Sequence, residues 1–347
     1  MRSIDGQPGG GQLVRTAVAL SAVTGDPIRM ENVRGGRDEP GLKPQHVASI
    51  ETVAALTDAT TENVTVGSET FEFEPGAVDA GRYERGVGTA GSITLVFDAV
   101  VPLALRVDEP ATVAISGGTD VKWSPPFDYF RHVKLPLLSD FGVQARTTLE
   151  RRGFYPTGGG HGELTIEPST IERVDLETRG GLESVSVHSV ASESLESASV
   201  AERQADTATE ALEGAPVSPP GSRVSIDTHS EYVETPDKGS TIVIVASFES
   251  SAAGFTALGA PGKPAEDVAR TATDRFERFL DTDAAVDAHM ADQIVPYLAL
   301  AGGQVRIPRV TDHVETHLGL IEAFGFTVTL DSIGNEEARL VSSGDRE

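Results

Sequence analysis

The stretch RGFYPTGGG, residues 152–160, ends in three consecutive glycines, and short glycine runs of this kind recur along the chain. Glycine pairs occupy positions 35–36, 117–118 and 302–303, near the ends of strand-like runs. Glycine adopts backbone conformations that other residues avoid, so such pairs are typical of tight turns beside strands. Their recurrence indicates repeated α/β units, although their spacing is too irregular to establish a repeat from the sequence alone.

Helical and strand patterns alternate in the first half of the chain. Apolar residues recur at helical spacing directly after the glycines at 9–11, so a helix is expected over 12–23. Gln12 and Arg15 then share one face near its N-terminal end. The other predicted elements are a helix at 44–56 and strands at 93–97 and 112–115.

The composition changes near residue 180, where a stretch rich in Ser, Glu and Ala begins. We therefore expect two domains: a large one formed by 1–181 and 284–347, and a small one, 182–283, inserted into it. The small domain has an α/β pattern of its own. Its predicted elements are strands at 184–190, 223–227 and 240–248, a helix through 201–212, the linker GAPVSPPGS at 214–222 and a helix from 264.

The composition excludes several classes of protein. The chain has 347 residues and no cysteine, which excludes disulfides, thiolate zinc sites and a cysteine nucleophile. The apolar run 95–105 contains Asp98 and is too short to span a bilayer, so no membrane partner is expected. The opening MRSIDGQPGGG has no apolar signal region, so a cytoplasmic location is expected.

The formal net charge of −25 argues at first against a nucleic-acid partner, because phosphates attract Lys and Arg. The charge is unevenly distributed, however. Residues 1–46 carry six basic and five acidic side chains, whereas residues 181–238 carry three basic and eleven acidic ones. Excess carboxylates on a locally basic protein are typical of adaptation to high salt, so we expect a halophilic protein in a saline cytoplasm.

Five separated segments resemble the RNA 3′-terminal phosphate cyclase family in order and spacing. Each alone is a weak signal, but RGFYPTGGG is close to the family signature and the five together are specific. The segments are DGQPGGGQLVR (5–15), RGGRDEPGLKPQH (34–46), SGGTDVKWSPPFDYFRHV (116–133), RGFYPTGGG (152–160), and HMADQ with VTDH (289–293 and 310–313).

The resemblance implies an α/β fold. The large domain would contain three repeated units, each with two helices on a four-stranded sheet, as in the enolpyruvyl transferases and the C-terminal domain of a translation initiation factor. The smaller inserted domain would be thioredoxin-like in topology.

The resemblance also implies a reaction that uses ATP and an RNA with a 3′-terminal phosphate. A histidine attacks the α-phosphate of ATP, the AMP moves to the RNA phosphate, and the neighbouring 2′-hydroxyl displaces AMP to form the 2′,3′-cyclic phosphate. Adenylation is chemically necessary because an oxide dianion does not leave at neutral pH, and neutral imidazole is a competent nucleophile. The family's nucleophile matches His313, in the register of Thr311 and Thr316, and His317 is the competitor one helical turn on.

Other residues match nucleotide-binding positions of the family. Without the resemblance, each arginine would be interpreted as a solvated surface charge, and the proline and tyrosine as a turn and a core aromatic. The positions expected to line the phosphates are Gln12, Arg15, Arg34, Arg37, Gln45 and His46. Those expected to form the adenine slot are Pro125, Tyr129, His289 and Gln293.

The sequence departs from the family at the metal site. Family members usually carry a glutamate before the triple glycine, but here Pro8 precedes Gly9 and the loop is two residues shorter. Asp292 matches the other carboxylate associated with the metal, and Asp5 is a candidate substitute. We expect Mg²⁺ or Mn²⁺ to be required but held more weakly, mainly through phosphates and water.

Three other functions compete with a cyclase. A non-catalytic cyclase-like protein of ribosomal RNA processing would keep the fold and generally lose the histidine, which is present here. An enolpyruvyl-type transferase would bind phosphates through Lys and Arg, but the motifs contain few lysines. A metal hydrolase built on His313, Glu315 and His317 is disfavoured because Val314, rather than Glu, follows the first histidine.

Overall fold

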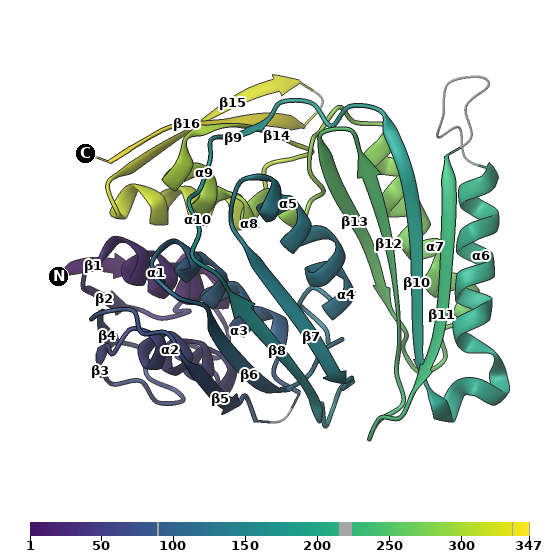
Figure 1. Ribbon diagram of the computed structural model, residues 1–347, viewed down its shortest axis with the longest axis horizontal. Helices are drawn as coiled ribbons and strands as arrows, with labels where there is room; N and C mark the ends of the chain where they lie inside the picture. The colour runs from purple at the N-terminus through teal and green to yellow at the C-terminus, as the bar shows by residue number, and fades with distance from the viewer. Residues whose placement is uncertain (89, 215–223, 335, 347) are drawn as a thin grey trace.

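The computed structural model describes residues 1–88, 90–214, 224–334 and 336–346. These residues form a mixed α/β protein with four mixed sheets of four strands each (Figure 1). Within them, no helix has the length and apolar character that crossing a bilayer requires.

The first sheet is formed by the N-terminal part of the chain. The predicted helices at 12–23 and 44–56 are confirmed, and α1 begins after Gly10 and ends at Gly25, whose φ of 77° provides a left-handed cap. In sheet order, its strands are β1 (Arg2–Asp5), β2 (Ile28–Glu31), β4 (Phe71–Glu74) and β3 (Thr60–Glu62), and its helices are α1 (Gly11–Thr24) and α2 (Pro44–Leu56).

The second sheet contains the predicted strand at 112–115 within β6. In sheet order, its strands are β5 (Arg82–Gly86), β6 (Ala111–Gly117), β8 (Gly160–Ile166) and β7 (Ala145–Arg151). Its helical segments are α3 (Ile93–Val100), η1 (Val101–Leu105), α4 (Phe127–Tyr129), η2 (Phe130–Lys134) and α5 (Leu135–Asp140).

The strand prediction at 93–97 is wrong, because this segment begins helix α3. Its β-branched and aromatic residues favoured a strand, but Ile93, Val96 and Phe97 are fully buried. A helix that is apolar on all sides is stable where it is covered on all sides. The Ser92 hydroxyl also caps this helix by accepting a hydrogen bond from the backbone N–H of Leu95 at 3.4 Å.

The third sheet combines β9 with the C-terminal part of the chain. In sheet order, its strands are β9 (Val174–Leu176), β14 (Gly303–Ile307), β16 (Glu337–Arg346) and β15 (Phe326–Gly334). Its helices are α8 (Met290–Gln293), α9 (Val295–Ala301) and α10 (Asp312–Ala323).

These three sheets share one topology. In each, the first two strands in chain order are parallel, the fourth is antiparallel to the second, and the third lies at the edge beside the fourth. The repeat that the glycine turns indicated is thus present in the strand pairing. Its spacing in sequence is irregular because more than a hundred residues separate β9 from β14, and they contain the fourth sheet.

The fourth sheet has α6 and α7 on one face (Figure 1), and the apolar residues on that face form a hydrophobic core separate from that of the other three sheets. Val243 and Val245, on its other face, belong to the large core. The predicted strands at 184–190 and 240–248 and both predicted helices are confirmed. The predicted linker 214–222 lies, apart from Gly214, outside the described residues. The strands in sheet order are β11 (Ser225–Val233), β10 (Leu182–Ser192), β12 (Ser240–Phe248) and β13 (Ser251–Leu258), and the helical segments are η3 (Glu193–Ala198), α6 (Val200–Gly214) and α7 (Ala265–Leu280).

Candidate active site

A cavity of about 460 Å³ lies between α8 and the N-terminal end of α10. Two of the segments singled out in the sequence, 289–293 and 310–313, contribute its walls. The lining residues are Ala288, His289, Asp292, Arg309, Val310, Thr311, Asp312 and His313.

His313 lies in the first turn of α10 with a half-exposed side chain. Thr311 caps this helix by accepting a hydrogen bond from the backbone N–H of Val314, and the Thr316 hydroxyl donates to the carbonyl of His313. Partial burial, with a contribution from Arg37, lowers the pKa of His313 below its usual value. The imidazole is therefore neutral, and so nucleophilic, near pH 7.

His317 occupies a different environment one turn further along α10. Its side chain is buried, and its Nε2 lies 2.9 Å from the hydroxyl of Thr16 on α1. Burial lowers the pKa of His317 to about 3, and its side chain is not part of the cavity wall. Of the two candidate nucleophiles, His313 is the one that lines this cavity.

Asp292 faces both histidines, with one carboxylate oxygen 3.8 Å from Nδ1 of His313 and 3.8 Å from Nδ1 of His317. Burial raises the pKa of Asp292 to about 6. Because the Nδ1 atom of His313 points to this carboxylate, its Nε2 atom is the nitrogen left for chemistry.

The glycine turn before α1 brings further predicted residues together. A Cβ on Gly11 would lie 2.1 Å from Nε2 of His46 and 3.1 Å from a guanidinium nitrogen of Arg15. A Cβ on Gly10 would lie 3.3 Å from a guanidinium nitrogen of Arg37. Only glycine permits this close approach, so the turn gathers two cations and an imidazole around the N-terminus of α1.

His46 is buried and accepts a hydrogen bond at Nδ1 from the backbone N–H of Lys43. Burial and the neighbouring Arg15 lower the pKa of His46 to about 3. Burial also lowers the pKa of Arg15. The side chain amide of Gln12 reaches the same turn, since its Oε1 would lie 2.6 Å from a Cβ on Gly10.

Arg34 and Gln45 contribute less directly. Arg34 donates from Nη1 to the carbonyls of Glu39 at 2.8 Å and Gly41 at 2.9 Å. This nitrogen therefore stabilises the loop that contains Arg34. Gln45 lies half-buried in the first turn of α2.

The predicted adenine slot is rearranged. Tyr129 is fully buried, donates from its hydroxyl to both carboxylate oxygens of Asp287 at 3.0 Å, and meets the ring of His289 edge-on at 5.9 Å. A base cannot stack on a ring that is covered on all sides, so the stacking role predicted for Tyr129 does not fit this arrangement. Tyr129 instead supports His289, which is exposed in the cavity, and Pro125 is likewise buried.

Several polar residues that hold the site were not predicted. Lys134 is buried and donates to Asp98 at 2.7 Å and to Gln293 at 2.8 Å, so the amide oxygen of Gln293 already has a partner. Arg309 lines the cavity four residues before His313, and its place beside the VTDH segment was an available signal. The Lys134 contacts gave no local signal, because they join residues distant in sequence.

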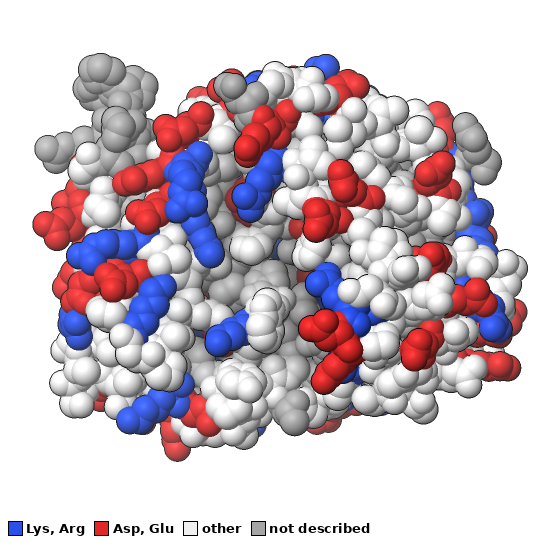
Figure 2. Space-filling view, turned by 180° about the vertical axis from the view of Figure 1, so that it is seen from behind, with Lys and Arg blue, Asp and Glu red and all other residues white. Residues whose placement is uncertain are grey.

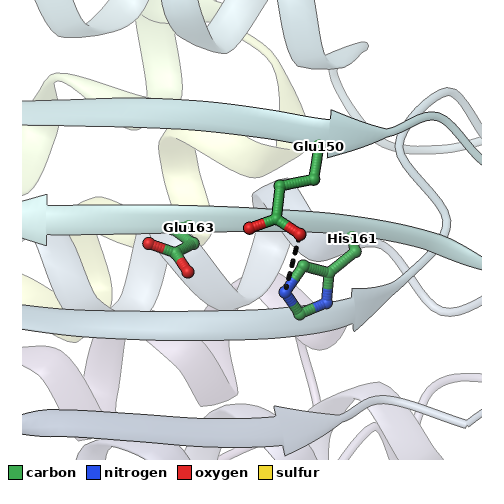
Figure 3. A group of neighbouring side chains, drawn as sticks. All are labelled: Glu150, His161 and Glu163. Carbon is green, nitrogen blue, oxygen red and sulfur yellow. Dashed lines mark ion pairs between the residues drawn. The ribbon is translucent and has the colours of Figure 1, made fainter.

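The expected metal ligands do not form a cluster. Asp5 is exposed and accepts hydrogen bonds from the backbone of Gln7 and the side chain of Asn32, so it shapes its own turn. In the described part of the chain, the group of three side chains with metal-binding spacing lies elsewhere, on β7 and β8 (Figure 3). It consists of Glu150, His161 and Glu163.

That group is a poor metal site in its present state. Figure 3 shows Glu150 and His161 facing each other with an ion pair between them, and the distance is 3.8 Å. Arg82 donates to both carboxylate oxygens of Glu163, so this carboxylate already has a cationic partner. Asp292 and Asp312 are the carboxylates that line the cavity itself, and of these Asp292 is the predicted metal ligand.

Comparison with known proteins identifies the family. Residues 7–330 match the sequence model described as RNA 3′-terminal phosphate cyclase. The chain belongs to this family. The RNA 3′-terminal phosphate cyclase of Halobacterium salinarum is 45% identical over 95% of this chain and 97% of its own length. That of Pyrococcus furiosus is 39% identical over 92% of each chain.

A solved structure, the enolpyruvyl transferase NikO from Streptomyces tendae, aligns with 98% of this chain at 12% identity and a TM-score of 0.34. The chain spans about half of that protein, since 48% of the NikO chain is covered.

Proposed function

We propose that this protein converts the 3′-terminal phosphate of an RNA into a 2′,3′-cyclic phosphodiester, using ATP and an adenylated histidine. Membership of the cyclase family supports the overall reaction. The observation that carries the mechanism is the position of His313, neutral and half-exposed at the cavity, with Arg15 and Arg37 near enough to influence its pKa.

In the first step, Nε2 of His313 attacks the α-phosphorus of ATP, forms a P–N bond and releases diphosphate. The RNA 3′-phosphate then takes the AMP, which frees the histidine and forms a phosphoanhydride. Finally the 2′-hydroxyl attacks the RNA phosphorus, loses its proton and displaces AMP. Arg15, Arg37 and the N-terminus of α1 would stabilise the charge that develops on phosphate oxygens.

The binding of ATP would use residues from both ends of the chain. Gln12, Arg34, Gln45 and His46 would complete the phosphate pocket, and His289 would contact the base. Mg²⁺ or Mn²⁺ would be held by Asp292 and by phosphate oxygens and water, and would neutralise charge on the triphosphate.

We further propose that residues 1–181 and 284–347 form the large cyclase domain and that 182–283 form a thioredoxin-like inserted domain. The shared topology of three sheets supports the first, and the separate core of the fourth supports the second. The acidic surface supports a role in a saline cytoplasm, where salt screens the repulsion between the protein and RNA.

Mass spectrometry of the intact protein after incubation with ATP and Mg²⁺ tests this function. We expect a mass increase of one AMP, which is labile in acid and maps to His313. A folded protein that acquires no AMP would instead support the non-catalytic alternative, a cyclase-like protein of ribosomal RNA processing.

A further inference from the structure

Two exposed aromatic side chains project from the second sheet's loops. Trp123, the only tryptophan of the chain, is 95% exposed, and Tyr155 is 64% exposed. Trp123 also has a φ of 63°, a left-handed conformation that is a genuine outlier for a bulky residue. An exposed ring held outward on strained backbone indicates a contact surface rather than a packing residue.

The two loops are fastened to each other. The backbone N–H of Thr119 donates to the carbonyl of Gly153 at 2.9 Å, and the N–H of Gly153 donates to the Thr119 hydroxyl at 3.0 Å. Beneath them, the buried guanidinium of Arg152 donates to Asp120 at 3.1 Å and to Asp128 at 2.6 Å. The loops that present Trp123 and Tyr155 are therefore held in one fixed arrangement.

Cations without carboxylate partners accompany these rings. Lys122 is exposed and directly precedes Trp123, and Arg151 is exposed at the end of β7, just before the Tyr155 loop. Lys238 lies on the turn between β11 and β12. That turn touches the Tyr155 loop, because the backbone N–H of Thr157 donates to Asp237 at 2.7 Å. None of the three cations forms an ion pair with any residue that the structure describes, although acidic residues outnumber basic ones 53 to 28.

The aromatic loop leads to the candidate active site. Six residues after Trp123, Tyr129 packs against His289 in the cavity wall. Figure 2 shows a hollow near the middle of the face opposite to that in Figure 1, with Lys and Arg side chains at its rim and acidic side chains both beside it and toward the edges. A polyanion guided by the rim cations would approach this hollow.

We propose that Trp123 and Tyr155 stack on bases of single-stranded RNA just upstream of the 3′-terminal phosphate, while Lys122, Arg151 and Lys238 contact its backbone. Aromatic rings stack on any base, and cations follow the phosphates, so this surface would bind RNA ends without strong sequence preference. A protein partner fits less well, because it would leave three cations without the polyanion they suit. The inference rests on the proposed cyclase function.

The single tryptophan makes a direct test possible. An RNA oligonucleotide with a 3′-phosphate, added without ATP, should quench the fluorescence of Trp123 in a saturable way. Trp123→Ala should raise the KM for this RNA roughly tenfold with little change in kcat, as expected for the loss of one base stack. Trp123→Phe, which keeps a ring, should restore most of the affinity.

Two further measurements separate this inference from the function itself. Adduct formation from ATP alone should be the same in Trp123→Ala and in the unmodified protein. Lys122→Ala should weaken RNA binding, whereas Arg173→Ala, which removes an exposed positive charge just before β9, should not. If the protein forms the adduct and cyclises RNA but Trp123→Ala leaves the KM for RNA unchanged, the surface does not bind RNA. If the unmodified protein forms no adduct, the proposed function fails instead.

Discussion

The cavity beside α10 contains predicted site residues, whereas the fourth sheet contributes packing. Asp292 and His313 line the cavity, and Arg15 and Arg37 lie near enough to lower the pKa of His313, so the candidate site draws on both ends of the chain. Every residue expected to bind the nucleotide lies outside 182–283. The fourth sheet has a core of its own and supplies packing instead, since the backbone N–H of Gly254 donates to Asp287 at 2.9 Å. The residues predicted to carry the chemistry thus lie with the repeated sheets, and the fourth sheet packs against Asp287, next to the cavity residue Ala288.

The largest effect is expected at the nucleophile. His313→Ala should abolish both AMP attachment and cyclisation, because it removes the nitrogen that forms the covalent bond. His317→Ala removes a buried side chain that is hydrogen-bonded to Thr16. It should therefore lower the stability of the protein but leave the AMP adduct detectable by mass spectrometry. Loss of the adduct in the His317 variant alone would mean that the nucleophile is one helical turn away from our assignment.

A smaller loss is expected from the cations of the cavity region. Arg37→Ala should slow adduct formation by roughly 100-fold, the typical cost of removing one donor that stabilises charge in the transition state. Arg173→Ala, which removes an exposed arginine just before β9, is the matched control and should leave the rate unchanged. Equal rates in the two variants would exclude Arg37 from the phosphate pocket.

Removing the fourth sheet tests the other side of the comparison. The two ends of 182–283 lie close together, since Arg179 donates to the carbonyl of Ala284 at 2.9 Å. Deleting this segment and joining its ends with a short glycine linker should leave a folded protein with roughly tenfold weaker cyclisation, because Tyr129 loses its cover. Circular dichroism checks that the shortened protein is folded, and the adduct assay checks its activity. An insoluble product would contradict the proposal that 182–283 is a separate domain.

Salt should change activity several-fold. The net charge of −25 repels RNA at low ionic strength, whereas Arg15, Arg34 and Arg37 would act at contact distance. In molar potassium chloride the Debye length falls to about 3 Å, which removes the long-range repulsion. Cyclisation of a short RNA should therefore rise from low to molar salt in protein that remains folded by circular dichroism. A steady fall, as in ordinary phosphate-binding proteins, would refute this explanation.

The smallest effect concerns stability and pH. Burial lowers the pKa of His46 to about 3, below its unfolded value near 6.5, so the unfolded chain takes up the proton first. The contribution of His46 to the free energy of unfolding is fully present above pH 6.5. It declines by about 1.4 kcal/mol per pH unit as the pH falls toward 3. Urea unfolding at pH 6.5 and pH 5 should show a smaller loss for His46→Gln than for the unmodified protein. An equal loss of stability in the two proteins would mean that groups other than His46 cause the pH dependence.

The sequence predicted the local elements well, and its site residues stay predictions. The helices at 12–23 and 44–56 follow from apolar periodicity and from the glycine and proline residues at their starts, which act within a few residues. The segment at 93–97 was misjudged because its composition suits a strand and only its burial on all sides favours a helix. The inaccessible ring of Tyr129 agrees with the interpretation of this residue as a core aromatic. Its covering residues, Gly254 and Asp287, could not be foreseen because they are distant in sequence.

Residue identity and spacing are enough to give the family, the order of the motifs and the register that favours His313 in VTDHVETH. The tertiary structure adds the difference in environment between the two histidines. His317 turns inward to meet Thr16, 301 residues away in sequence, whereas His313 faces the cavity. It also placed Trp123 beside the loop of Tyr155. Which face of a helix is buried depends on packing against distant segments, and packing is not encoded in any local pattern.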